Sequence, residues 1–175
     1  MASSDQGRRR KRETKTGFSE SSRIYNTSLE LIDKDESEAF RLNYIAAQTG
    51  MHDAVLAMGW FYLNGVGVEA DEQAAVHWYK KAARQGDSRA MYSLGEIAYF
   101  NEEYSEALTW FERAASNGHQ RSTFWLGKMY WRGEGVAKSQ KAARDCFARA
   151  ASGKVLEAGR VLRYLAFLSK KTHQR

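Results

Sequence analysis

The sequence contains no proline and one cysteine among its 175 residues. Average usage would place about 9 prolines in a chain of this length. Because proline costs about 3 kcal/mol in a helix interior, its absence favours an all-helical protein. A single thiol, Cys146, excludes an intrachain disulfide framework. We therefore expect Cys146 to be a small buried side chain and the protein to be cytoplasmic.

The sequence also lacks the patterns of membrane spans, export signals and common cofactor sites. No apolar run approaches the ~18 residues of a membrane-spanning helix, and the N-terminal segment is basic and polar. The four histidines are far apart, with no second thiol beside them, so no metal site is predicted. Walker-type and dinucleotide-binding glycine signatures are absent. We expect no cofactor, no metal, no small-molecule substrate and no catalytic residue.

The net charge of +6 is concentrated at the two ends of the chain. Residues 1–17 have a formal charge of +4 and residues 154–175 have +5, which leaves −3 on the remainder. We predict a disordered basic tail over residues 1–17 and a short basic tail over 170–175. The densest basic run is Arg8, Arg9, Arg10, Lys11 and Arg12. Such a run could bind nucleic acid or an anionic membrane, or it could be a plain solvated tail.

Three stretches of the chain, residues 52–86, 87–118 and 119–153, are versions of one another. Each contains an apolar residue followed by glycine and, later, an Ala-Ala pair. The equivalent glycines are Gly59, Gly95 and Gly127, at spacings of 36 and 32 residues. Repeats of this length indicate helix pairs that stack, because one pair cannot bury its own apolar face.

The same pattern predicts where the helices begin and end. In the first and third units a Gly-rich loop, containing Gly65 or Gly133, joins the helices, whereas the second unit has a loop four residues shorter. Asp71 and Ser139 are predicted N-caps. A degenerate unit over residues 18–50 precedes these units. It has one expected helix over 18–32 and a second that Asp35 caps and that runs through Gln48. Residues 154–169 are predicted to form a helix that caps the stack.

Glycine in the middle of a helix needs a physical reason, because it costs about 1 kcal/mol relative to alanine. Close approach of the second helix in each pair supplies one. We expect Trp78, Trp110 and Cys146, which share one register of that second helix, to act as core wedges against its partner.

These landmarks make the chain resemble the Sel-one-like repeat family. The matching residues in the first unit are Ala54, Met58, Gly59, Tyr62, Gly65, Gly67, Val68, Ala75, Trp78, Tyr79, Ala82, Ala83 and Gly86. The resemblance covers about residues 35–153 and departs from the pattern at Ser122 and Cys146. It implies an all-α, right-handed α-solenoid of about three and a half tetratricopeptide-like helix pairs plus a C-terminal capping helix. It also implies a protein-binding scaffold rather than an enzyme.

The ligand surface that the resemblance implies is the concave face, lined by the first helix of each pair. The register assigns to it Asp53, Leu56, Trp60, Leu63, Asn64, Arg89, Tyr92, Glu96, Tyr99, Phe100, Arg121, Phe124, Lys128, Trp131 and Arg132. Its aromatic residues exceed what the repeat requires, and aromatic and Arg side chains dominate interface energies. An extended peptide or an amphipathic helix would suit such a groove. Alternatively, these rings pack against neighbouring units.

Three functions remain open from the sequence. The first is a non-enzymatic adaptor that binds a protein or peptide. The second is a regulatory binder of nucleic acid or anionic membrane that acts through the basic N-terminal tail. The third is a β-lactamase-type enzyme, as in cysteine-rich members of the wider family, which the single cysteine disfavours. The groove or an open end of the stack would also allow a homodimer.

Overall fold

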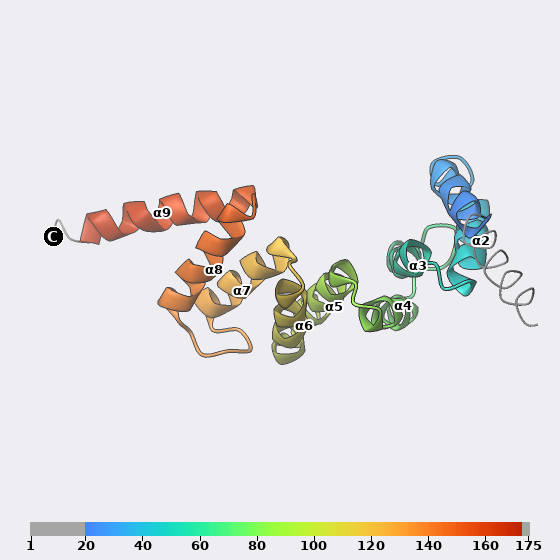
Figure 1. Ribbon diagram of the computed structural model, residues 1–175. Coiled ribbons are helices and arrows are strands. Elements are labelled where there is room, and N and C mark those ends of the chain that lie inside the picture. Colours follow the sequence, from blue (N-terminus) through green and yellow to red (C-terminus); the bar gives the residue numbers. More distant parts are fainter. Residues whose placement is uncertain (1–19, 173–175) are drawn as a thin grey trace, which may run out of the picture. The chain divides into compact units, whose positions relative to one another are not determined.

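The computed structural model describes residues 20–172, and for residues 167–172 it describes the backbone alone. The predicted tail over residues 1–17 lies outside this range. Residues 20–31 are helical, and the helices that follow are α2 (Glu36–Gln48), α3 (His52–Asn64), α4 (Glu72–Arg84), α5 (Ser88–Phe100), α6 (Tyr104–Ser116), α7 (Gln120–Arg132), α8 (Gln140–Ser152) and α9 (Leu156–Thr172) (Figure 1). The all-helical fold is confirmed. None of the helices between residues 20 and 172 is long and apolar enough to cross a membrane.

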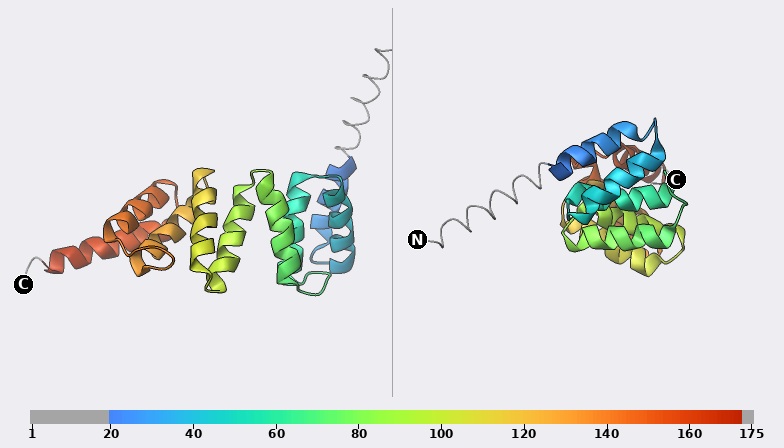
Figure 2. Two further views of the ribbon diagram at one scale, coloured as in Figure 1. Left: turned by 90° about the horizontal axis from the view of Figure 1, so that it is seen from below. Right: turned by 90° about the vertical axis from the view of Figure 1, so that its right-hand side faces the viewer.

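The helices pack in pairs. The most extensive contacts join α3 to α4, α5 to α6 and α7 to α8, which confirms the predicted repeat of helix pairs. Figure 2 shows α5 and α6 side by side as an antiparallel pair. The chain divides into two compact units between Gln85 and Gly86. Unit 1 contains α2 to α4, and unit 2 contains α5 to α9.

Side-chain caps fix the starts of several helices where the sequence places them. The carboxylate of Asp35 accepts a hydrogen bond from Glu38 N, and that of Asp71 accepts one from Ala74 N. The hydroxyl of Ser139 accepts one from Ala142 N, which begins α8. Each cap satisfies an amide that the helix leaves unpaired, and such caps are typically worth about 1 kcal/mol.

The mid-helix glycines accommodate an aromatic ring from the second helix of the same pair. Gly59 faces Tyr79, Gly95 faces Phe111 and Gly127 faces Phe147. A Cβ at these glycines would lie 2.5–2.6 Å from the nearest ring carbon. The rings of Tyr79, Phe111 and Phe147 are 4% exposed or less. Each glycine therefore leaves room for one buried ring.

The predicted wedges lie one residue before those rings, and one of the three predictions is wrong. Trp78 and Cys146 are buried, but Trp110 is only partly buried. The indole N–H of Trp110 donates to Glu106, and Arg113 lies over its ring. One step along a helix turns a side chain by about 100°, so Phe111 rather than Trp110 points at the glycine of the partner helix.

The Gly-rich loops pack against the N-terminus of the second helix in the preceding pair. Gly67, at φ 65°, lies against the backbone of Glu36 at the start of α2. Gly135, at φ 67°, lies against the backbone of Tyr104 at the start of α6. The left-handed backbone and the close approach both exclude a side chain. The shorter turn between α5 and α6 uses Glu102 in the left-handed region instead.

Candidate functional site

Helices α5 and α7 present aromatic and charged side chains on one face of unit 2. The α7 residues recur every three or four positions, which places them on one side of the helix. We use the name α5–α7 face for Tyr92, Glu96 and Tyr99 of α5 together with Arg121, Phe124, Trp125, Lys128, Trp131 and Arg132 of α7.

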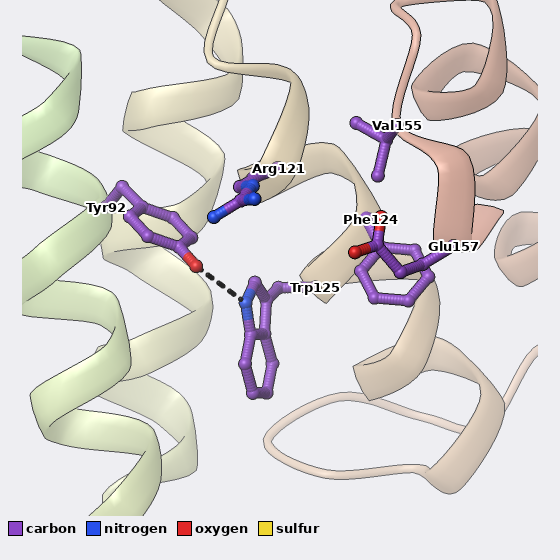
Figure 3. A pocket seen from close by; sticks show the side chains of 6 residues that line it. All are labelled: Tyr92, Arg121, Phe124, Trp125, Val155 and Glu157. Carbon is purple, nitrogen blue, oxygen red and sulfur yellow. Dashed lines mark hydrogen bonds between the residues drawn. The ribbon is translucent and has the colours of Figure 1, made fainter.

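Hydrogen bonds hold the N-terminal half of this face in place. The Tyr92 hydroxyl donates to Glu96 Oε1 at 2.5 Å. It also accepts a hydrogen bond from Trp125 Nε1 at 3.2 Å, the dashed line in Figure 3. Burial, reinforced by the bond to Glu96, raises the pKa of Tyr92 to about 12. Burial also raises the pKa of Glu96. The phenol is therefore neutral at physiological pH and serves to orient its two neighbours.

A second network holds the C-terminal half. The Tyr99 hydroxyl donates to Glu134 Oε2 at 2.8 Å and accepts from Arg132 Nη1 at 2.6 Å. The Lys128 ammonium lies 3.5 Å from the centroid of the Trp125 ring. Burial, together with the nearby Arg132, lowers the pKa of Lys128. Partly desolvated charges of this kind gain more from an opposite charge than fully solvated ones do.

Ring contacts add stiffness to both networks. Trp125 stacks on the buried Phe111 ring, with centroids 5.5 Å apart and planes inclined by 7°. Tyr99 meets the edge of Trp125 at 4.7 Å. Hydrogen bonds and ring contacts therefore hold Tyr92, Tyr99 and Trp125 in position before any ligand binds.

Two open hollows lie along the face. The first hollow, of about 160 Å³, is lined by Tyr92, Arg121, Phe124, Trp125, Val155 and Glu157 (Figure 3). The second hollow, of about 280 Å³, is lined by Phe124, Lys128, Trp131, Arg132, Phe147, Val161, Tyr164 and Leu165. Phe124 contributes to both. Between residues 20 and 172 no group of three or more His, Cys, Asp or Glu side chains could hold a metal ion.

The structure brings together most of the residues predicted in unit 2. Tyr92, Glu96, Tyr99, Arg121, Phe124, Lys128, Trp131 and Arg132 all belong to the α5–α7 face. Phe100 is 72% exposed at the end of α5 and meets the edge of Trp125. Arg89 instead pairs with the Asp87 carboxylate at 2.7 Å, at the start of α5.

The remaining predicted residues lie elsewhere. Asp53, Leu56, Trp60, Leu63 and Asn64 are on α3 of unit 1, where Trp60 is 40% and Leu63 is 37% exposed. Of the predicted aromatic residues other than Phe100, Trp60 is exposed, whereas Tyr92, Tyr99, Phe124 and Trp131 are half-buried. The basic run from Arg8 to Arg12 lies outside the described residues.

Sequence reasoning missed Trp125 and the contribution of α9. Trp125 follows Arg121 by four positions, so helical spacing alone would have placed it on the face. Val161, Tyr164 and Leu165 line the second hollow, and the helix that carries them, α9, packs on α8. Their spacing of three and four residues was the available signal.

The fold and its repeats define a helical-repeat protein of the tetratricopeptide-like class. The model of the Sel1 repeat matches residues 52–87, 88–119 and 121–154, which together make up more than half of the chain. The protein belongs to the Sel1 repeat family. Sel1 repeats mediate protein–protein interactions.

Curated relatives share short stretches with this chain. It is 40% identical over 62 residues to the chitin synthase regulator SKT5 of Saccharomyces cerevisiae, covering 35% of this chain and 9% of that protein. It is 39% identical over 64 residues to the ERAD-associated E3 ubiquitin-protein ligase component HRD3A of Arabidopsis thaliana, covering 36% and 9%. The chain thus spans under a tenth of the length of these relatives.

Solved structures share the fold over most of the chain. A protective antigen with an SLR fold from uropathogenic Escherichia coli, c5321, superposes with a TM-score of 0.78 at 28% identity, covering 89% of this chain and 35% of that one. A Sel1 repeat protein from Oxalobacter formigenes superposes with a TM-score of 0.74 at 27% identity, covering 81% and 62%.

Proposed function

We propose that the protein is a non-enzymatic adaptor that binds a segment of another protein along the α5–α7 face. The observation that carries the proposal is the set of partly accessible aromatic side chains that hydrogen bonds and ring contacts hold beside two open hollows. Side chains ordered before binding lose little conformational entropy when a ligand arrives. Trp, Tyr and Arg, which predominate here, are the residue types enriched in interface hot spots.

The polar groups of the face support binding rather than catalysis. Tyr92 and Glu96 hydrogen bond to each other, and Arg132 is engaged with Tyr99 and Glu134. These groups hold the surface in shape and are not aimed together at one point in a closed cavity. The names of the relatives, a regulator of chitin synthase and a component of a ubiquitin ligase, support an adaptor role.

Peptide display tests the proposal and does not require the natural partner to be identified first. Random peptides are selected on the wild-type protein, and the affinities of the enriched peptides are then measured by fluorescence anisotropy. Trp131→Ala should weaken binding by about 30-fold, because a hot-spot residue contributes about 2 kcal/mol.

Trp110→Ala provides a matched control. Trp110 is also a half-buried indole, but it lies on α6 and lines neither hollow. Its replacement should change affinity by less than about twofold, with both variants folded by circular dichroism. Equal losses in the two variants, or no enriched peptide at all, would contradict the proposal.

A further inference from the structure

Buried apolar side chains of the core form part of the lining of the second hollow. Its lining includes Phe147 and Leu165, which are 2% and 5% exposed, together with the half-buried Phe124, Trp131 and Val161. A partner that places an apolar side chain here would cover the half-buried rings of α7 and remove apolar surface from water.

The charged side chains that line this hollow are all cationic. Lys128 and Arg132 lie one helical turn apart on α7, and no Asp or Glu belongs to the lining. Arg132 is partly neutralised by Glu134 at 3.6 Å. Lys128 is held over the Trp125 ring and has no salt bridge among the described residues, although Glu96 and Glu134 lie near enough to interact with it electrostatically. The two cations of the lining are therefore only partly neutralised, and Lys128 makes no ion pair of its own.

The surrounding sequence extends this positive field. Residues 119–166 contain ten Lys and Arg against three Asp and Glu, whereas residues 86–118 contain two against six. A ligand for the second hollow is therefore attracted if it is acidic and repelled if it is basic. The basic N-terminal segment of this chain is thus disfavoured as the occupant, and so is the basic helix α9 of a second copy.

We propose that the second hollow binds an acidic amphipathic segment of a partner protein, with an apolar side chain in the hollow and carboxylates facing Lys128 and Arg132. The proposal rests on the function proposed above and specifies its ligand. Nucleic acid fits less well, because a continuous phosphate backbone would also meet Glu96, Glu134 and Glu157 on the same side of unit 2. A peptide can restrict its carboxylates to positions opposite the cations.

Three labelled peptides of about 12 residues test this chemistry: one of Glu and Leu in helical amphipathic order, one with Lys in place of Glu, and one with Ser in place of Leu. The Glu/Leu peptide should bind at least about tenfold more tightly than the other two, and its affinity should fall as salt is added. Equal or tighter binding of the Lys/Leu peptide would overturn the proposal. So would stronger binding of a single-stranded oligonucleotide.

Variants locate the effect on the protein. Lys128→Gln should lower the affinity for the Glu/Leu peptide about five- to tenfold. Lys141→Gln makes the same charge change on an exposed α8 residue outside the hollow, and it should change that affinity by less than about twofold. Equal effects of the two variants would refute the site. If display selects Trp131-dependent peptides without an excess of Asp and Glu, the acidic ligand is wrong while the adaptor function stands. If no Trp131-dependent peptide is selected, the adaptor function itself fails.

Discussion

Replacing Gly127 by alanine should destabilise the third repeat even though alanine is the better helix former. A Cβ at this position would lie 2.6 Å from Phe147 Cε1 and 2.7 Å from its Cδ1. The Phe147 ring is 2% exposed, so it cannot swing into solvent without opening the core. Overpacking of this kind costs about 2–3 kcal/mol, and helix propensity returns about 1 kcal/mol. The free energy of unfolding should therefore fall by about 1–2 kcal/mol.

Gly159 provides the matched control for this substitution. It also lies in a helix, α9, but the nearest atom to a Cβ there is the Arg163 guanidinium at 3.8 Å. Gly159→Ala should therefore raise stability, by up to about 1 kcal/mol. The opposite signs of the two substitutions separate a steric effect from a helix-propensity effect.

Urea unfolding followed by circular dichroism measures both variants, and amide hydrogen exchange in α7 and α8 places the change within unit 2. Phe147→Leu should restore part of the stability lost in Gly127→Ala, with a coupling of about 0.5–3 kcal/mol between the two sites. If Gly127→Ala is as stable as the wild type or more stable, the ring does not explain the mid-helix glycines.

Three further predictions concern local features. Gly67→Ala should lower the free energy of unfolding by at least about 2 kcal/mol, because the backbone has a positive φ and a Cβ would also meet the Glu36 carbonyl. Gly50→Ala should lower it by about 1 kcal/mol, because the φ is positive there too but no atom lies within 4 Å of the added Cβ. Ser139→Ala should lower it by about 1 kcal/mol in urea unfolding, through loss of the α8 cap. The pKa of Tyr92 is about 12 in the folded state, above its ordinary value of 10.0. The contribution of the neutral Tyr92 phenol to the free energy of unfolding should therefore be intact below pH 10 and be lost as the pH rises towards 12. Tyr92→Phe should abolish that part of the pH dependence, as measured by alkaline unfolding.

Features that depend on local chemistry could be predicted from the sequence. The caps at Asp35, Asp71 and Ser139 follow from the affinity of short polar side chains for unpaired helix amides. The left-handed glycines of the loops follow because few other residues adopt that backbone. These signals lie within a few residues of the structure that they determine.

The identity of the core wedge depended on a one-residue difference in register. Trp110 and Phe111 are adjacent and both aromatic, and Trp110 was favoured because it lies four residues before the first alanine of the Ala-Ala pair, as Trp78 and Cys146 do. The position of Phe111 is aromatic in all three units, as Tyr79 and Phe147 show, whereas the position of Trp110 is a cysteine in the third unit. That consistency was the better guide, because each mid-helix glycine must accommodate the same kind of ring.

The part of the candidate site that lies on a single helix could be predicted from the sequence. The α7 register placed Phe124, Lys128 and Trp131 on one face, as the structure does. The second hollow also needs Val161 and Tyr164 of α9, and their position depends on how that helix packs beyond α8. How one helix packs against another is a tertiary property, and the periodicity of apolar residues within one helix does not determine it.

The indole N–H signals of the five tryptophans provide the most direct test of the proposed binding face. A display-selected peptide is titrated into the protein while these signals are followed by NMR, with assignments from single substitutions. If the α5–α7 face binds the peptide, the signals of Trp125 and Trp131 should shift and that of Trp110 should not. A shift confined to Trp110, or saturating binding that moves neither Trp125 nor Trp131, would contradict it.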